Sequence, residues 1–252
     1  MTLDAWRLAV GTLTVLPVAP PGEIDRPMAA RAMALAPVAA VPLGLCAAVV
    51  GWLGWTVGLP SLLVGLIMVA ALALGTRALH LDGLADTVDG LGSGRSAERA
   101  LEIMKQGDLG PMGAVALILV LGAQAVAFSS VVDGLRGAAA AGLVVCCSRA
   151  ALVVGCRRGV PAARRNGLAW SVAGTVPLAV SIAVWLLAIV VLVAAADLLG
   201  RWWLGVAAGV VSLATVLVLV GHAVRRLGGI TGDVLGATVE IALTVMIICV
   251  AA

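Results

Sequence analysis

Long apolar stretches separated by short polar segments dominate this sequence. A helix needs about 20 consecutive apolar residues to cross the hydrocarbon core of a bilayer, because each residue adds about 1.5 Å. Seven stretches approach or exceed this length, at residues 36–58, 61–81, 112–132, 138–156, 176–196, 203–221 and 237–252. The pattern predicts an all-α fold, a polytopic transmembrane helical bundle of about seven spans, built as one domain over residues 1–252.

The start of the chain follows a different pattern, because its apolar stretch at 8–20 is too short to cross a bilayer. Only Arg7 immediately precedes this stretch, and Pro17, Pro20 and Pro21 stand where a signal peptide would have a small-residue cleavage site. We therefore expect a retained interfacial or re-entrant segment rather than a signal peptide.

Composition agrees with a membrane protein, since 62% of the residues are hydrophobic and 12% are charged. A soluble domain has about 45–50% apolar and about 25% charged residues. The net charge of +3 comes from 16 Lys and Arg against 13 Asp and Glu, without a long basic tract, so nucleic acid is not an expected partner. The five cysteines lack C-x-x-C spacing, and we interpret them as small core residues.

The basic residues indicate the orientation, because Lys and Arg near span ends are held on the cytoplasmic side. With the N-terminus inside, only Arg136 and Arg201 of the 16 Lys and Arg fall on the outer side. The long loops at 81–111, 155–175 and 222–236 then all face the cytoplasm. We expect an integral protein of the cytoplasmic membrane whose N-terminus, catalytic loops and active site face the cytoplasm.

Three aspartates follow the second apolar stretch, in the sequence HLDGLADTVDG at residues 80–90. On a helix, Asp82, Asp86 and Asp89 share one face, since their spacing is i, i+4 and i+7. Three neighbouring carboxylates repel one another, and Mg²⁺ is a natural compensating ion because it takes oxygen ligands. A solvated acidic helix end is the alternative, but a position at the mouth of an apolar span favours a metal site. His80 adjoins this face and is either an interfacial histidine or part of the site.

Basic side chains near this face could neutralise phosphate oxygens. Residues 96–105 predict a short amphipathic helix that carries Arg99 and Lys105. Arg149 lies about two turns inside an apolar stretch, where an ionisable side chain is costly unless it is paired or in a polar cavity, so a site role is expected. Arg164 belongs to a loop whose basic residues also serve as topology anchors.

The last loop is rich in glycine, which frees the backbone to wrap an anionic or flat ligand. Gly228, Gly229 and Gly232 lie in it, followed by Asp233 and then by Glu240 in the final stretch. The two carboxylates strengthen the prediction that this loop contributes to the site.

In this order along the chain, the motifs resemble those of the cobalamin synthase family, the adenosylcobinamide-GDP ribazoletransferases. The resemblance rests on Leu16-Pro17, Leu79-His80-Leu81-Asp82-Gly83-Leu84-Ala85-Asp86 with Asp89, Glu98-Arg99, Ile103-Met104-Lys105, Ser148-Arg149, Arg164 with Gly167-Leu168, and Gly228-Gly229-Ile230-Thr231-Gly232-Asp233. Two departures are Val15, where the family commonly has Arg, and residues 105–108, which read Lys-Gln-Gly-Asp where the family commonly has Lys-Asp-Ser-Arg.

The resemblance implies a Mg²⁺-dependent transferase of the last steps of cobalamin biosynthesis in a bacterial membrane. It would join adenosylcobinamide-GDP to α-ribazole, or to α-ribazole 5′-phosphate, and release GMP. The resemblance is compatible with a homo-oligomer or with association with other corrinoid enzymes at the lipid bilayer.

Residue roles follow from the same resemblance. Asp82, Asp86 and Asp89 would hold the metal, and one of them or His80 would act as the base for the attacking hydroxyl. The implied substrate contacts are Arg99, Lys105, Arg149 and Arg164 on the diphosphate, and Asp233 with Gly228, Gly229 and Gly232 on the nucleotide or the metal.

Two alternatives remain open from the residues. A CDP-alcohol-type phosphotransferase shares the D-x-x-D-G opening seen at 86–90, but the rest of that motif does not follow. A cation-coupled membrane transporter would also use acidic residues in spans. Such a transporter is expected to place them in both halves of the bundle, whereas here they cluster at one predicted interface.

Overall fold

The structure is a computed structural model that describes residues 2–252, apart from the side chains of Thr2 and Leu168. Within this range the chain folds into thirteen helices. They are α1 (Thr2–Leu13), α2 (Arg26–Ala39), α3 (Val41–Thr56), α4 (Ser61–Gly75), α5 (Leu79–Gly92), α6 (Ala97–Gln106), α7 (Pro111–Val131), α8 (Leu135–Ser148), α9 (Ala151–Gly155), α10 (Leu168–Val172), α11 (Leu178–Asp197), α12 (Trp202–Leu227) and α13 (Gly232–Ala251).

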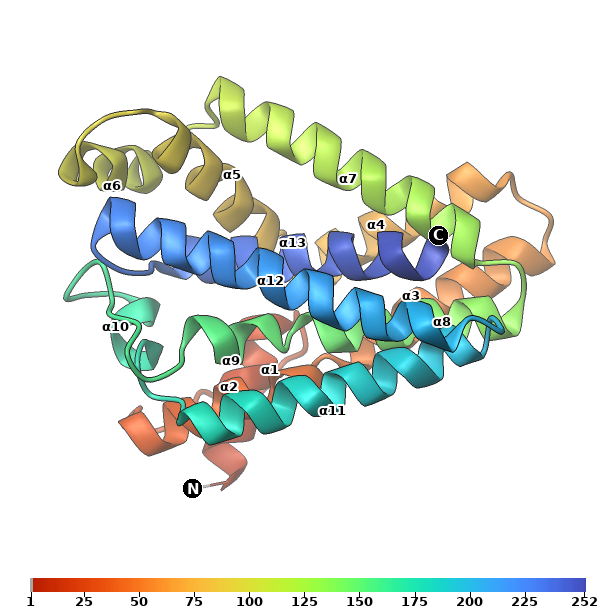
Figure 1. Cartoon of the computed structure of the whole chain (residues 1–252), viewed down its shortest axis with the longest axis horizontal. Helices are drawn as coiled ribbons and strands as arrows, with labels where there is room; N and C mark the ends of the chain where they lie inside the picture. Colours follow the sequence, from red (N-terminus) through yellow and green to blue (C-terminus); the bar gives the residue numbers. More distant parts are fainter. Residues whose placement is uncertain (1) are drawn as a thin grey trace.

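The long helices run roughly side by side along the longest axis of the molecule (Figure 1). Helix α13 lies near the centre, where it packs against α5, α7, α8 and α12. The α8–α9 segment and α13 are the most buried of the candidate spans, at 83% and 72%, whereas no other exceeds 39%. The outer helices expose apolar side chains such as Ile118 and Val218, which suits contact with lipid tails.

The predicted polytopic helical bundle is confirmed. Six helical segments are long and apolar enough to cross a membrane, and the bent pair α4 and α5 raises the number to as many as seven. The segment predicted at 8–20 is helical only as far as Leu13, where α1 ends, and the 12 residues of α1 are too few to span. The second predicted span, at 61–81, is interrupted: α4 ends at Gly75, and α5 leaves at 92° to it.

The break between α4 and α5 is formed by two residues with left-handed backbone conformation, Arg77 and Ala78, at φ 54° and 55°. A left-handed residue other than glycine costs about 1–2 kcal/mol. The surrounding chain offsets this cost, because Ala78 N–H donates to the Ala73 carbonyl at 2.7 Å and Val15 N–H donates to the Gly75 carbonyl at 2.9 Å. The N-terminal segment thus caps α4 and allows α5 to turn toward α13.

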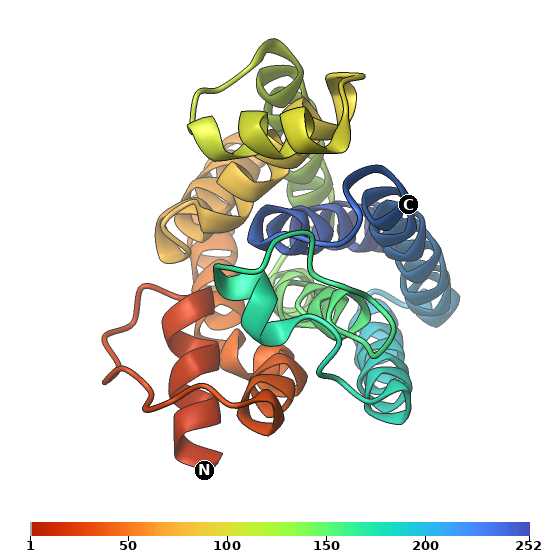
Figure 2. The same cartoon turned by 90° about the vertical axis from the view of Figure 1, so that its left-hand side faces the viewer.

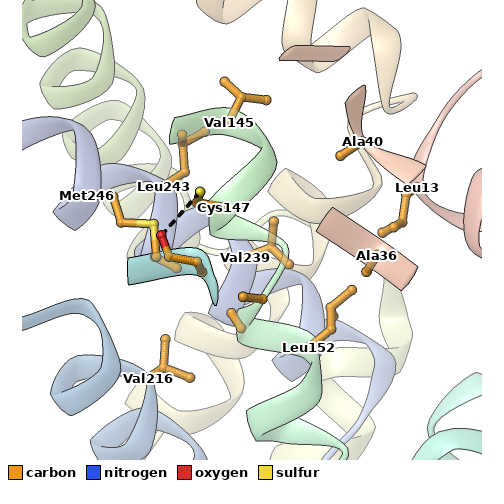
Figure 3. Close-up of a cluster of buried hydrophobic side chains, with 14 of the residues drawn as sticks. Leu13, Ala36, Ala40, Val145, Cys147, Leu152, Val216, Val239, Leu243 and Met246 are labelled. Carbon is orange, nitrogen blue, oxygen red and sulfur yellow. Dashed lines mark hydrogen bonds between the residues drawn. The ribbon is translucent and has the colours of Figure 1, made fainter. Parts of the chain in front are cut away.

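The core is built mainly from small and branched aliphatic side chains. Figure 3 shows a part of it in which side chains from α1, α2, α8, α9, α12 and α13 meet. Cys147 lies there and donates from its Sγ to the Ala188 carbonyl at 3.6 Å. Cys147 and Cys156 are buried as predicted, but Cys46 is exposed on α3, so the core interpretation is wrong for Cys46.

The long loops gather at one end of the bundle, on the left in Figure 1. Seen from that end, the segment that carries α10 lies across the ends of the central helices, with α1 on one side and α12 and α13 on the other (Figure 2). The start of α8, which carries Arg136, and the α11–α12 connection, which carries Arg201, lie at the opposite end. The connection before α10 carries Arg164 and the one before α13 carries Gly228 and Gly229, and we refer to this end as the loop end.

Candidate functional site

A close crossing of α5 and α13 brings the predicted acidic residues together. A Cβ added to Gly83 would lie 2.7 Å from the carbonyl oxygen and 2.9 Å from the Cα of Asp233. Gly236, one turn further along α13, faces α5 in the same way, since its Cβ would lie 3.2 Å from the His80 Cα. The two helices can pack this closely only because neither glycine has a side chain. Asp233 is therefore held beside Asp82.

The carboxylates at this crossing repel one another. Partial burial, followed in order by the negative charges of Asp82, Asp233 and Asp89, raises the pKa of Asp86 to about 6. Asp82 is exposed and Asp86 is half-buried on the same helix. A cation would relieve this repulsion. Within residues 2–252, however, no three His, Cys, Asp or Glu side chains form a ready metal-binding group.

Asp89 has a different environment from Asp82 and Asp86. Its Oδ2 accepts a hydrogen bond from Gly110 N–H at 2.8 Å, and its Oδ1 accepts one from Gly113 N–H at 2.9 Å. These donors lie at the start of α7, where backbone N–H groups have no partner within the helix. The metal role of Asp89 stays a prediction, and what the geometry shows is that both of its oxygens accept hydrogen bonds that fix the N-terminus of α7.

A cavity of about 330 Å³ opens beside this crossing. Its polar lining consists of Thr12, His80, Arg164, Asn166, Thr231 and Asp233. His80 is buried and its Nδ1 has no hydrogen-bond partner. The Arg164 guanidinium donates to the carbonyl of Leu101 on α6 and attracts the Asp233 carboxylate. Acidic and basic predicted residues thus meet at one cavity.

The N-terminus of α13 forms one wall of this cavity. Thr231 caps the helix, since its Oγ1 accepts a hydrogen bond from Val234 N–H at 3.2 Å and lies 3.1 Å from an Asp233 carboxylate oxygen. Gly232 lines the cavity, and no atom lies within 4 Å of the position a Cβ would take. A helix N-terminus carries partial positive charge, so this wall suits a phosphate group.

Gly228 and Gly229, which were predicted as substrate contacts, have structural roles in the fold. Gly228 ends α12 with a φ of +77°. A Cβ at Gly229 would lie 2.5 Å from backbone atoms of Ala162 and Ala163. Two backbone hydrogen bonds join the same loops, from Ala163 N–H to the Ile230 carbonyl and from Ile230 N–H to the Pro161 carbonyl, both at 2.9 Å. These contacts hold the Arg164 loop against the start of α13.

The structure does not bring Arg99 and Lys105 to the cavity. Both are exposed on α6, and Arg99 pairs with Glu102 of the same helix at 2.7 Å. The contribution of α6 to the site is instead its Leu101 carbonyl, which orients Arg164. The prediction that these two side chains contact a diphosphate therefore gains no support from the geometry.

Arg149 also lies away from the cavity that His80 and Asp233 line, deep inside the bundle. It is 1% exposed, and it donates to the Val145 carbonyl and the Ser148 hydroxyl, both at 2.8 Å. Across a small cavity of about 10 Å³ its charge is balanced by Glu240, which accepts a hydrogen bond from Gln124 at 2.9 Å. Arg149 is therefore paired inside the bundle, and its predicted contact with the diphosphate gains no support from the geometry.

Four polar residues near these features were not predicted from the sequence: Thr12, Gln124, Asn166 and Thr231. Thr231 could have been found, because a threonine just before an apolar helix is a common N-terminal capping signal. Asn166 follows two arginines in a loop, and Gln124 is a lone amide in an apolar stretch, so neither has a local signal of its role.

Comparisons with known proteins agree with the motifs. A profile of the cobalamin-5-phosphate synthase family matches residues 5–251. The adenosylcobinamide-GDP ribazoletransferase of Nocardioides sp. (strain ATCC BAA-499 / JS614) is 49% identical over 249 residues, which cover 99% of both chains. Proteins of the same name from Frankia casuarinae and Bradyrhizobium diazoefficiens are 40% and 38% identical, covering 96% and 92% of this chain and 91% and 86% of their own. No solved structure matches. Because the profile spans nearly the whole chain, the protein belongs to the cobalamin-5-phosphate synthase family.

Proposed function

We propose that this protein transfers the adenosylcobinamide-phosphate group of adenosylcobinamide-GDP to α-ribazole or its 5′-phosphate. The observation that carries the proposal is the single cavity at which Arg164, the α13 N-terminus and the Asp233 carboxylate meet beside Asp82 and Asp86. The names of the relatives give the activated corrinoid as their substrate. A site that joins anion-binding groups to carboxylates suits a diphosphate substrate.

In this reaction a ribose hydroxyl oxygen of α-ribazole attacks the phosphorus that carries the cobinamide. The new phosphorus–oxygen bond forms, the bond to GMP breaks, and GMP leaves with the electron pair while the hydroxyl proton is lost to a base. The protein mainly positions the reactants and stabilises negative charge in such transfers. His80 contributes an unpartnered ring nitrogen at the cavity wall, which can hydrogen-bond a polar group of a bound substrate.

Arg164 and the start of α13 are the groups that we assign to the diphosphate. A guanidinium binds phosphate oxygens with two parallel hydrogen bonds when its orientation is fixed. The Leu101 carbonyl fixes Arg164, and the loop contacts at Gly229 hold its backbone. The partial positive charge of the α13 N-terminus acts in the same direction.

We assign a Mg²⁺ site to Asp82 and Asp86 of α5 with Asp233 of α13. When bound, the ion would neutralise charge on the diphosphate and in the transition state. The residues fit, because they offer only carboxylate oxygens, and burial together with their mutual repulsion raises the pKa of Asp86. Mg²⁺ commonly takes one or two carboxylates and completes its shell with waters and substrate phosphates, so a preformed group of three converging ligands is not required.

We further propose that the loop end faces the cytoplasm of a bacterial cell. Among the Lys and Arg residues, Arg136 at the start of α8 and Arg201 in the α11–α12 connection alone lie at the opposite end. This is the asymmetry that the positive-inside rule describes. This orientation gives a nucleotide substrate direct access to the cavity from the cytoplasm.

The test is GMP release by the purified protein in liposomes, supplied with adenosylcobinamide-GDP, α-ribazole and Mg²⁺. We expect release that requires both α-ribazole and Mg²⁺, and that falls at least about tenfold in Asp82→Asn. Asp108→Asn is the matched control, because Asp108 is also exposed but lies in the α6–α7 connection and does not line the cavity. A folded wild-type protein that releases no GMP would overturn the proposal.

A further inference from the structure

A second cavity at the loop end is lined by arginines and belongs to no part of the proposed active site. It measures about 390 Å³ and lies between the first turns of α2, the start of α11 and the connection that precedes α11. Arg26, Arg31 and Arg158 are the charged residues of its lining. None of its lining residues lines the cavity that contains His80 and Asp233.

No carboxylate is among the described residues that line this cavity. Within residues 2–252, no ion pair joins a carboxylate to Arg26, Arg31 or Arg158. The Arg26 guanidinium donates to the Gly174 carbonyl at 3.0 Å, which fixes it at the rim. The side chains of Arg31 and Arg158 make no hydrogen bond in the described part of the chain and remain exposed. Three guanidinium groups around one hollow make an anion site, since each offers several donors to phosphate oxygens.

The rest of the lining is apolar. Ala30 and Ala34 of α2 face Val180 of α11 across the cavity, with Pro27 and Pro177 at the helix starts. Next to the cavity, α11 exposes the apolar side chains of Leu178 and Ile182. A ligand that places a phosphate among the arginines would therefore rest its remaining atoms on apolar surface that continues along a candidate span. This combination fits an amphiphile better than a free anion.

The level of the cavity also fits a membrane interface. Helices α2 and α11 both begin there, and each begins a segment long and apolar enough to cross a membrane. Trp170, which is about half exposed, lines an adjoining cavity that shares Arg26 and Gly174 with this one. Tryptophan is enriched where a protein meets the head-group region.

We propose that Arg26, Arg31 and Arg158 form a binding site for the phosphate head group of an anionic phospholipid, whose acyl chains lie along α2 and α11. Basic pockets between spanning helices bind such head groups. The site would hold the loop end at the level of the head groups, separately from the transfer reaction.

The test measures lipid retention by the purified full-length protein in detergent, with native mass spectrometry. Wild type should retain phosphatidylglycerol in preference to phosphatidylcholine. Arg31→Gln and Arg158→Gln should each weaken phosphatidylglycerol retention about fivefold, whereas Arg158→Lys should keep most of it. Arg26 is left unchanged because it also bonds to Gly174. Arg225→Gln is the matched control, since Arg225 is exposed at the same end and does not line this cavity.

Two results would overturn the proposal. The first is equal retention of the two lipids, or an equal loss in Arg225→Gln and Arg158→Gln. The second comes from adding inorganic phosphate without lipid and following thermal unfolding. If phosphate stabilises wild type but not Arg158→Gln, while phosphatidylglycerol is retained no better than phosphatidylcholine, the cavity binds a free anion. A lipid preference that needs Arg31 and Arg158, with no stabilisation by phosphate alone, supports the lipid assignment.

Discussion

Gly83 of α5 lies directly against the backbone of Asp233 of α13, so that a Cβ at position 83 would be 2.7 Å from the Asp233 carbonyl oxygen. The contact joins two residues that are 150 positions apart in the sequence, at 83 and 233. It places the acidic face of α5 beside the anion-binding N-terminus of α13. The proposed metal and diphosphate sites therefore depend on a residue that has no side chain.

This contact predicts that Gly83→Ala abolishes most of the activity. Alanine normally favours a helix over glycine by about 1 kcal/mol, but here its methyl group meets backbone atoms that cannot move aside. Such overpacking costs about 1–3 kcal/mol and would separate α5 from α13. We expect a lower unfolding temperature in detergent together with at least about tenfold slower GMP release.

Gly92→Ala is the matched control for that substitution. Gly92 is also a glycine of α5, but its Cβ would meet only Met112 atoms at 3.6 Å or more, which is an ordinary contact. Activity and unfolding temperature should stay close to wild type. Equal effects of the two substitutions would contradict the role given to the Gly83 contact.

Substitutions of Asp89 and of Asp82, both on α5, should change different properties of the protein. Asp89→Ala removes the acceptor for the N–H groups of Gly110 and Gly113, so we expect a loss of about 1–2 kcal/mol in the free energy of unfolding. Asp82→Asn removes one of several mutually repelling charges, so it should leave stability unchanged or raised. It should instead increase the Mg²⁺ concentration needed for half-maximal GMP release.

Urea unfolding in detergent and a Mg²⁺ titration of GMP release, made on the same preparations, distinguish these two residues. Removal of Mg²⁺ with EDTA should stop release by wild type, and added Mg²⁺ should restore it. If Asp89→Ala shifts the Mg²⁺ requirement without loss of stability, Asp89 is a metal ligand after all and the assignment to α7 is wrong.

Arg164 should matter far more than its neighbour Arg165. Both are arginines of one loop, but Arg164 lines the cavity and bonds to the Leu101 carbonyl, whereas Arg165 is exposed. A hydrogen bond to a charged group contributes about 1.5–3 kcal/mol, so Arg164→Ala should raise the KM for adenosylcobinamide-GDP by about tenfold or more. Steady-state kinetics of GMP release with Arg165→Ala as the control make the comparison, and similar KM values in both variants would refute the assignment.

Removing one charge of the buried pair Arg149 and Glu240 should lower the free energy of unfolding more than removing both charges. Glu240→Leu leaves a guanidinium that is 1% exposed without its balancing charge, which costs about 3–5 kcal/mol. Replacing both residues, as Arg149→Met with Glu240→Leu, should recover much of that stability, because a matched apolar pair avoids the desolvation penalty. Chemical unfolding of the two single variants and the double variant in one detergent measures the coupling; additive losses would contradict it.

The sequence by itself determined the class of the protein. The length of an apolar stretch decides whether a helix can cross a bilayer, and this is a local property, so the helical bundle and most of its spans could be predicted. The acidic face of α5 could be predicted for the same reason, because Asp82 and Asp86 are one turn apart on a helix whatever surrounds it. The order of the motifs along the chain was enough to indicate the family.

The tertiary structure decided what each predicted residue does, because that depends on partners far away in the sequence. Asp89 binds the start of α7, and Arg149 faces Glu240 rather than the cavity that His80 and Asp233 line. Asp233 joins the acidic face because Gly83 allows two backbones to touch. The charge of a residue is fixed by its type, but whether that charge meets a substrate, a helix end or a buried counter-charge is fixed only when the helices pack.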